Sequence, residues 1–353
     1  MTRLLVTGGA GFIGSAIVDA ALARGWRVRV LDSLRPDVHG RGYAPDPRVE
    51  FVHADVRDRD ACAVALFGVD VVSHQAAKVG PGVDFSDAAD YVGSNDLGTA
   101  ALLAGMAEAG VRRLVVASSM VVYGEGNYRD AMGRRARPEP RRDDDLAAGR
   151  FDPVDEQGEL LVPDLIGEDA PLDPRNVYAI TKLTQEHLST SWARSTGGSA
   201  VALRYHNVYG PGMPQNTPYA GVASLFRSAI ARGEAPRVFE DGRQRRDFVH
   251  SRDVASANIA AIEATQATAP GVFRAFNVGS GEVHTVGELA EQLSRHAGGL
   301  PPVVTGEYRL GDVRHIAASS DRIRLELGWR PSVSFEDGIR DFASAPLRNA
   351  VEG

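Results

Sequence analysis

Short apolar runs alternate with longer mixed stretches along the first third of the chain. Each run is long enough for one buried strand, and the runs lie at residues 3–7, 27–31, 49–53, 69–73 and 113–118. Helix-like stretches separate them, one of which covers residues 91–109. Strands that alternate with helices predict an α/β fold built on a doubly wound parallel sheet.

The first apolar run leads directly into a glycine-rich turn. Gly8 permits a tight turn, Gly11 lets the backbone approach a pyrophosphate, and Gly14 allows the following helix to pack closely on the strand. Phe12 and Ile13 open that helix, whose positive N-terminus suits a phosphate group. Strand, turn and helix together predict a dinucleotide-binding site.

An acidic residue ends the second apolar run. Asp32 stands close to the offset at which a carboxylate hydrogen-bonds the adenosine ribose, and such an acid favours NAD over NADP. Arg35 supports the alternative, because it would reach a ribose 2′-phosphate if its loop turned inward.

Several residues follow the third and fourth runs, at the sheet edge where ligands bind in this type of fold. The candidate cofactor contacts are Asp55, Val56, Gln75, Ala76, Ala77 and Lys78. Asp55 is expected to accept from the adenine amino group. A structural hydrogen bond is the preferred interpretation for His74, and Lys78 is either a solvated charge or a ligand contact. Asn95 is expected to tie the central helix to the neighbouring strand loop.

Tyr178 and Lys182 are four residues apart and therefore share one helical face. A neighbouring ammonium favours the phenolate, which would bring a tyrosine base toward neutral pH. The pair alone is weak support, since the same spacing occurs on many solvated helices.

Composition restricts the function classes. Of the 353 residues 24% are charged, and the net charge of −7 offers no basic field for nucleic acid. The absence of an apolar run near ~20 residues argues against a membrane span, and the start of the chain does not resemble a signal peptide, so we expect cytoplasmic residence. Cys62, the single cysteine, cannot form an internal disulfide and is expected at a partly buried helix position. We expect no metal site.

A long segment rich in Arg, Asp and Pro separates Gly124 from Tyr178. Residues 151–154 and 159–162 predict a small hairpin within a mixed-charge surface flap. Its acids interleave the arginines without an aromatic platform, which argues against nucleic-acid binding. A lid over the ligand, a subunit contact and a tolerated insertion remain open alternatives.

Taken together, the chain resembles the extended short-chain dehydrogenase/reductase family, closest to its NAD-dependent nucleotide-sugar epimerases of the UDP-glucose 4-epimerase type. The matching segments are the glycine turn, Asp32, Asp55-Val56, 74–77, Ser119, Tyr178 with Lys182, 203–211, 246–250, 276–280 and 309–312.

The resemblance implies a Rossmann-type NAD-binding domain over residues 1–207, with an insertion at 125–170. A smaller mixed α/β lobe over residues 208–353 would bind the nucleotide-diphosphate sugar, with some chain crossing between the lobes. The two helices that start near Tyr91 and Tyr178 form the dimer interface in this family, so a homodimer is expected.

The resemblance also implies residue roles. Tyr178 would be the base, Lys182 would hold the nicotinamide ribose and lower the tyrosine pKa, and Ser119 would hydrogen-bond the reacting hydroxyl. Tyr205 and His206 would lie near the nicotinamide. His206 replaces the usual aromatic residue, so it either contacts the carboxamide or sugar or simply packs.

The expected substrate contacts come from the C-terminal lobe. Asn207, Arg246 and Arg309 would bind the diphosphate, and Asp312 the uridine-type ribose. Val222 would close over the base, or it simply begins a helix. Arg314 and His315 depart from the aromatic-containing segment of typical glucose epimerases.

The family reaction oxidises the sugar at C4 with NAD to a transient 4-keto sugar. Dehydratases of the family carry an Asp-Glu pair directly after the Ser/Thr, whereas this chain has Met120 and Val121, which cannot move a proton. Dehydration and decarboxylation are therefore disfavoured and a C4 epimerase acting on a UDP-hexose or UDP-hexuronate is expected. A 4-keto reductase, a dehydrogenase and a non-catalytic NAD-binding regulator remain alternatives.

Overall fold

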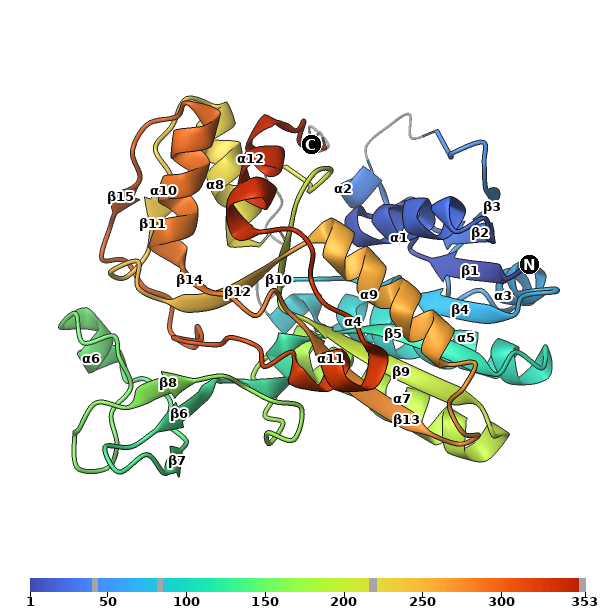
Figure 1. Cartoon of the computed structure of the whole chain (residues 1–353), viewed down its shortest axis with the longest axis horizontal. Helices are drawn as coiled ribbons and strands as arrows, with labels where there is room; N and C mark the ends of the chain where they lie inside the picture. Colours follow the sequence, from blue (N-terminus) through green and yellow to red (C-terminus); the bar gives the residue numbers. More distant parts are fainter. Residues whose placement is uncertain (40–43, 81–84, 216–220, 349–353) are drawn as a thin grey trace.

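The computed structural model describes residues 1–39, 44–80, 85–215 and 221–348. Its centre is a seven-stranded parallel sheet in the order β13-β9-β5-β4-β1-β2-β3 (Figure 1). The strands are β1 (Arg3–Thr7), β2 (Arg27–Asp32), β3 (Glu50–His53), β4 (Val71–His74), β5 (Arg113–Ser119), β9 (Ser199–Tyr205) and β13 (Phe273–Val278). The first five coincide with the predicted apolar runs to within two residues, which confirms the doubly wound α/β fold.

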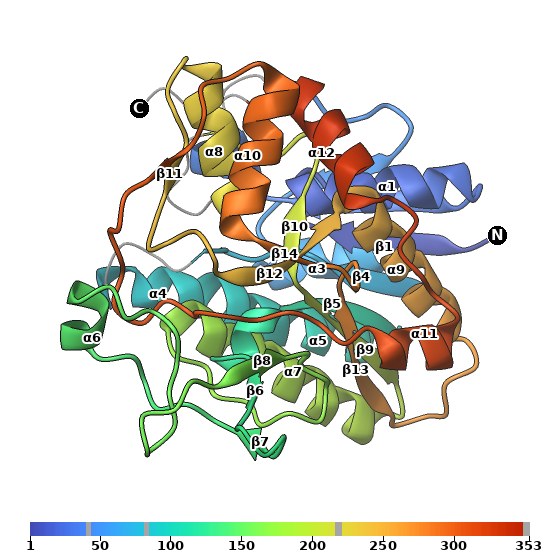
Figure 2. The ribbon, with the colours of Figure 1, turned by 60° about the vertical axis from the view of Figure 1, so that its left-hand side comes forward.

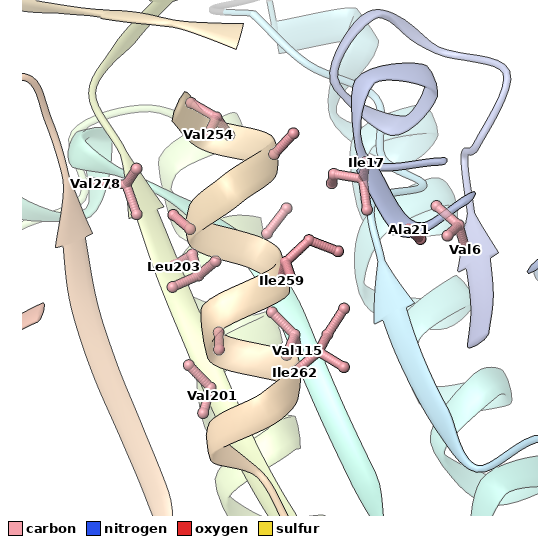
Figure 3. Packing of buried hydrophobic residues seen from close by; sticks show 14 of the residues in the cluster. Val6, Ile17, Ala21, Val115, Val201, Leu203, Val254, Ile259, Ile262 and Val278 are labelled. Carbon is pink, nitrogen blue, oxygen red and sulfur yellow. The ribbon is translucent and has the colours of Figure 1, made fainter. Parts of the chain in front are cut away.

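Helices cover both faces of the sheet. On one face, α1 (Phe12–Ala23) and α9 (Ser251–Ala264) bury an aliphatic core against the strands. Figure 3 shows Ile259 of α9 between Leu203 of the sheet and Ile17 of α1. The other face is covered by α3 (Arg59–Leu66), α5 (Gly98–Glu108) and α7 (Val177–Thr196). Cys62 is fully buried in α3.

The helix predicted over residues 91–109 is interrupted. It consists of α4 (Ala88–Tyr91), a π-helical segment (Val92–Leu97) and α5, so it begins three residues earlier than expected. The π-helical turn is a local geometry that apolar spacing does not encode, and such turns often occur at functional sites. None of the helices in the described ranges is long and apolar enough to cross a bilayer.

The C-terminal part of the chain builds a second core above the carboxyl ends of the sheet strands. Helices α8 (Val222–Ala231), α10 (Val286–Ala297) and α12 (Phe335–Ser344) pack around it. Its strands are β10 (Asn207–Tyr209), β12 (Arg245–His250) and β14 (Val283–Thr285) in one sheet, and β11 (Arg237–Val238) and β15 (Val303–Val304) in another.

The chain crosses between the two cores more than once. After β12 it returns to the central sheet as α9 and β13, and β13 pairs with β9 along its whole length. It then enters the C-terminal core and later passes back through α11 (Asp321–Leu327), whose Ile323 packs in the first core. Sequence order therefore does not separate the two parts at a single residue.

The segment between Gly124 and Tyr178 forms a small subdomain beside the C-terminal core (Figures 1 and 2). Its strands β6 (Asn127–Arg129), β7 (Arg135–Ala136) and β8 (Val162–Asp164) form a sheet, and α6 (Asp143–Ala147) follows β7. The predicted hairpin is present in a minimal form. Its two arms meet in one antiparallel bridge between Val154 and Leu160, and β8, which begins at the end of the second arm, pairs with β6.

Candidate active site

The glycine turn has the geometry that a pyrophosphate site requires. Gly8 has a φ of +67°, and a Cβ there would lie 2.6 Å from the Ala76 nitrogen. At Gly14 a Cβ would lie 2.1 Å from the Gly8 carbonyl oxygen, so only glycine lets α1 approach the strand. A Cβ on Gly11 would meet only the Gly8 carbonyl oxygen, at 3.2 Å, so no other protein atom lies close to this side of the Gly11 backbone. These features fit an NAD pyrophosphate at the N-terminus of α1.

Asp32 lies directly beside this turn. Its carboxylate accepts hydrogen bonds from the backbone nitrogens of Ala10 at 3.0 Å and Leu34 at 2.9 Å. The contact fixes the end of β2 to the glycine turn. Arg35, the residue that would favour NADP, instead forms an ion pair with Asp90 at 3.0 Å. The Asp32 carboxylate beside the turn and the pairing of Arg35 with Asp90 favour NAD over NADP.

His74 is a structural residue, as expected. Its ring is buried between the hydroxyls of Thr7 at 2.7 Å and Thr99 at 2.9 Å. Burial and the nearby Lys182 lower the His74 pKa to about 3, so the ring stays neutral. This residue links the ends of β1 and β4 to α5.

Two further predictions at this edge have different outcomes. Asn95 does tie the π-helical segment to the strand loop, because its side chain exchanges hydrogen bonds with the Lys78 backbone at 2.7 and 3.0 Å and donates to Thr181 at 2.9 Å. The interpretation of Lys78 as a solvated charge is wrong. Its ammonium is buried, 2.8 Å from Asp90, and lies over the ring of Tyr91.

Gln75 and Tyr205 belong to a polar network between two strand ends. The Tyr205 hydroxyl donates to Gln75 at 3.1 Å and accepts from Asn258 at 2.8 Å. The backbone nitrogen of Ala76 donates a hydrogen bond to the Thr7 hydroxyl at 3.3 Å, which places Ala76 beside the glycine turn. The network holds β4, β9 and α9 together below the expected nicotinamide site.

Asp55 and Val56, two further predicted cofactor contacts, follow the end of β3. Asp55 forms an ion pair with Arg57 at 2.7 Å, and this hydrogen-bonded pair lowers the Asp55 pKa. Val56 is buried against Gly98, where a Cβ would lie 2.6 Å from its side chain. Contacts of Asp55 and Val56 with adenosine remain predictions.

Tyr178, Ser119 and Lys182 come together at the carboxyl end of β5. Tyr178 lies in the first turn of α7, which Asn176 caps by accepting from the Ala179 nitrogen at 2.8 Å. The Ser119 side chain is a polar neighbour of the Tyr178 hydroxyl. The Lys182 ammonium lies 6.0 Å from the centre of the tyrosine ring and donates to a β5 carbonyl oxygen at 3.0 Å. The pair therefore does not lie on a solvated helix face.

The electrostatics of the pair differ from the simple expectation. Burial raises the Tyr178 pKa to about 12, and the neighbouring Ser119 side chain only partly opposes this. Burial likewise lowers the Lys182 pKa to about 7, against the favourable charge of Asp96. Without ligands, Lys182 thus does not lower the tyrosine pKa below its usual value. Desolvation is the largest cause of both shifts, because Lys182 is buried and Tyr178 is only partly exposed.

Met120 and Val121 form the first residues of a 3₁₀ turn (Met120–Tyr123) directly after Ser119. The Ser119 hydroxyl accepts from the Val121 nitrogen at 3.4 Å, which starts that turn. Neither side chain can exchange a proton with a ligand held by Ser119 and Tyr178.

His206 and Asn207 follow β9 in the direction of the C-terminal core. His206 is buried, burial lowers its pKa to about 3, and Asn277 is its polar neighbour. Both of its ring nitrogens are buried without a hydrogen-bond partner among the described residues, so a contact with the carboxamide or sugar and simple packing both stay predictions. The side-chain oxygen of Asn207 is buried without a hydrogen-bond partner in the described part of the chain. Such a group is costly unless a ligand completes it.

Three of the predicted substrate contacts, Arg246, Arg309 and Asp312, lie close together. Arg246 donates to the backbone oxygens of Val313 at 2.6 Å and Arg314 at 2.9 Å, immediately after Asp312. Arg309 and Arg246 are both cationic neighbours of the Asp312 carboxylate. Two arginines beside one acid suit a nucleoside diphosphate. Val222 begins α8 and packs on the C-terminal core.

Sequence reasoning missed the charged residues that join the insertion to the C-terminal core. Arg141, in the insertion, is buried and lies 2.8 Å from Glu240. Arg314 is fully buried and forms ion pairs with Glu240 and with Asp152 of the insertion. The prediction of a surface flap is therefore wrong for this part. These pairs are distant in sequence, so only the mixed charge of the insertion hinted at them.

Comparison with known proteins agrees with this geometry. The sequence matches the NAD dependent epimerase/dehydratase family over residues 4–145 and 154–279. The dTDP-L-rhamnose 4-epimerase of Burkholderia thailandensis is 36% identical over 96% of this chain and 93% of its own length. The UDP-glucose 4-epimerase of Mycolicibacterium smegmatis is 30% identical over 96% of both chains.

A solved structure shares the whole architecture. The Thermus thermophilus UDP-glucose 4-epimerase in complex with NAD superimposes with a TM-score of 0.75 at 32% identity. The match covers 97% of this chain and 98% of that one. By sequence and by fold, this chain belongs to the NAD dependent epimerase/dehydratase family.

Proposed function

We propose that this protein is an NAD-dependent 4-epimerase of a pyrimidine nucleoside-diphosphate sugar. The observation that carries the proposal is the cluster of Ser119, Tyr178 and Lys182, in which Ser119 and Lys182 are buried and Tyr178 is partly exposed, together with the non-ionisable Met120 and Val121 that follow Ser119. The cluster can take a proton from one sugar hydroxyl and return it. A second proton transfer, as dehydration requires, has no acid or base directly after Ser119.

The residues of this chain have separate tasks in the proposed reaction. The glycine turn and Asp32 would hold NAD, which supplies the hydride acceptor. Tyr178 would remove the C4 hydroxyl proton, with Ser119 as a hydrogen-bond partner of that hydroxyl. Lys182 would hold the nicotinamide ribose. The tyrosine must ionise against the cost of burial, so its pKa has to fall when the ligands are bound.

The nucleotide would lie beside Arg246, Arg309 and Asp312, and the buried oxygen of Asn207 would gain a partner at the diphosphate end. Both uridine and thymidine diphosphate sugars suit this arrangement. The relatives named above include an enzyme of each kind. The narrower expectation of a UDP-hexose or UDP-hexuronate is therefore tested against dTDP-sugars in the substrate panel described next.

The test is a panel of UDP- and dTDP-hexoses, UDP-hexuronates and dTDP-L-rhamnose, followed by NMR of the anomeric and C4 protons. Interconversion of C4 epimers without net NADH supports the proposal. Stoichiometric accumulation of NADH would identify a dehydrogenase instead. Loss of the C6 hydroxyl would identify a dehydratase. If none of the sugar nucleotides in the panel changes, the protein is a non-catalytic NAD-binding protein.

We also propose a homodimer formed by the helices around Tyr91 and Tyr178. Large apolar side chains are exposed on both elements, with Val92 at 46%, Leu97 at 57% and Ile180 at 50% of full exposure. Light scattering coupled to gel filtration should give twice the mass of the chain, 37.7 kDa.

A further inference from the structure

The insertion holds the expected nucleotide loop from several sides. Tyr308, at the start of that loop, donates to Asp143 of α6 at 2.9 Å. Arg141 donates to the backbone oxygen of Asp312 at 2.6 Å. At the end of the loop, Asp152 accepts from Arg314 at 2.7 Å. Figure 2 shows α6 beside the chain that leads from β15 into this loop.

Glu240 is the junction of these contacts. One of its carboxylate oxygens accepts from Arg141 at 2.8 Å and the other from Arg314 at 2.8 Å. The insertion contributes one residue of each charge to these pairs. Its Arg141 pairs with Glu240 of the C-terminal core, and its Asp152 pairs with Arg314 of that core. All three members of the Arg141, Glu240 and Arg314 set are buried. Arg314 also pairs with Asp241 at 2.7 Å, so each buried charge is held from more than one side and the network favours one geometry.

The backbone at Glu240 supports a positional role. Its φ of +53° lies in the left-handed region, which is uncommon for a residue other than glycine. Such a conformation persists where surrounding contacts over-determine it, and it is frequent at ligand sites. Here the contacts are the two arginines and the bond from its own nitrogen to the Glu307 oxygen at 2.7 Å.

From this geometry we infer that the insertion is a clamp that positions the nucleotide-binding loop over residues 308–315. Arg141 is its central positioning residue. It acts through the Asp312 carbonyl and through Glu240, and it places the Asp312 and Arg309 side chains for the nucleoside diphosphate. The inference rests on the proposed function, because that function assigns the nucleotide to this loop.

The clamp predicts an effect on nucleotide affinity that is separate from chemistry. Tyr178 and Ser119 lie on the central sheet side, and Arg141 contacts neither of them. Arg141→Met should therefore raise KM for the sugar nucleotide and Kd for UDP or dTDP by about tenfold, because the loop must be ordered when the ligand binds. The value of kcat at saturation and the bound NAD should stay unchanged.

The test measures UDP and dTDP binding by calorimetry on the NAD-loaded protein, together with KM and kcat. Arg142→Met is the matched control, since Arg142 is the exposed neighbour in the same insertion, and it should bind like wild type. Tyr308→Phe removes one surface bond of the clamp without disturbing a buried charge, so it keeps the test valid if Arg141→Met fails to fold. It should also weaken nucleotide binding, to a smaller degree.

The outcomes separate the two claims. If wild type binds neither UDP nor dTDP, the proposed nucleotide site fails. If wild type binds one of them and both Arg141→Met and Tyr308→Phe bind it equally well, the clamp is wrong while the site stands. A fall in kcat with unchanged KM would also overturn the clamp, because it would place Arg141 in the chemical step.

Discussion

The glycine turn gives the sharpest quantitative prediction about the cofactor. A Cβ on residue 14 would lie 2.1 Å from the Gly8 oxygen, whereas ordinary contacts begin at 3.4 Å. Gly14→Ala therefore forces α1 and the turn apart by about 1 Å. Overpacking of this kind costs about 1–3 kcal/mol. If the turn must return to its native position to hold NAD, that cost corresponds to a rise of roughly 5- to 150-fold in the Kd for NAD.

Two further variants isolate the cause. Gly167→Ala is the control, because a Cβ there meets nothing within 4 Å, and it should leave NAD binding unchanged. Gly11→Ala meets only the Gly8 oxygen, at 3.2 Å, so it should fold normally yet still weaken NAD by blocking close approach of the pyrophosphate.

The assay is NAD titration of stripped protein by tryptophan fluorescence, with a thermal melt of each variant. The reasoning is refuted if Gly14→Ala and Gly11→Ala both bind NAD as tightly as the Gly167→Ala control. In that case the turn would be a structural connection and the cofactor would lie elsewhere.

Three other predictions follow from buried or exposed groups. Glu186→Ala removes both oxygens that bond Arg204, at 2.8 and 2.9 Å, and should lower the free energy of unfolding in urea by about 3–5 kcal/mol; an unchanged midpoint would contradict this. Asp96 raises the pKa of Lys182, so Asp96→Asn should move the alkaline limb of the pH–rate profile, where Lys182 loses its proton, to lower pH. A limb that stays in place would show that Lys182 does not control it. Leu97→Glu should convert the proposed dimer to a monomer in light scattering, and a retained dimer would place the interface elsewhere.

The strands and the ligand-binding edge could be predicted because their signals are local. Each of the first five strands is a continuous apolar run, and its polar end follows within a few residues, as at Asp32 and His74. The Tyr178 and Lys182 spacing likewise placed both groups on one helix face. Local pattern could not give their pKa values, because the desolvation comes from β5 and the surrounding core.

The errors involve contacts between distant parts of the chain. Arg141 and Glu240 are 99 positions apart, and Asp152 and Arg314 are 162 apart. A single sequence shows only that these residues are charged, and exposed charges are the usual case. The buried position of Lys78 likewise depends on a partner outside its own strand end, since Asp90 lies on α4, and it removes the solvated-charge alternative while the ligand contact stays a prediction.

The most direct test of the proposed chemistry is Tyr178→Phe, measured by NMR of epimer formation with the sugar nucleotide that the panel identifies. The substitution removes only the hydroxyl that would act as the base and should leave NAD bound. General acid–base catalysis contributes about 10²- to 10⁴-fold, so epimer formation should slow by at least about 100-fold. Turnover within about twofold of wild type, with NAD still bound, would contradict the assignment of Tyr178 as the catalytic base.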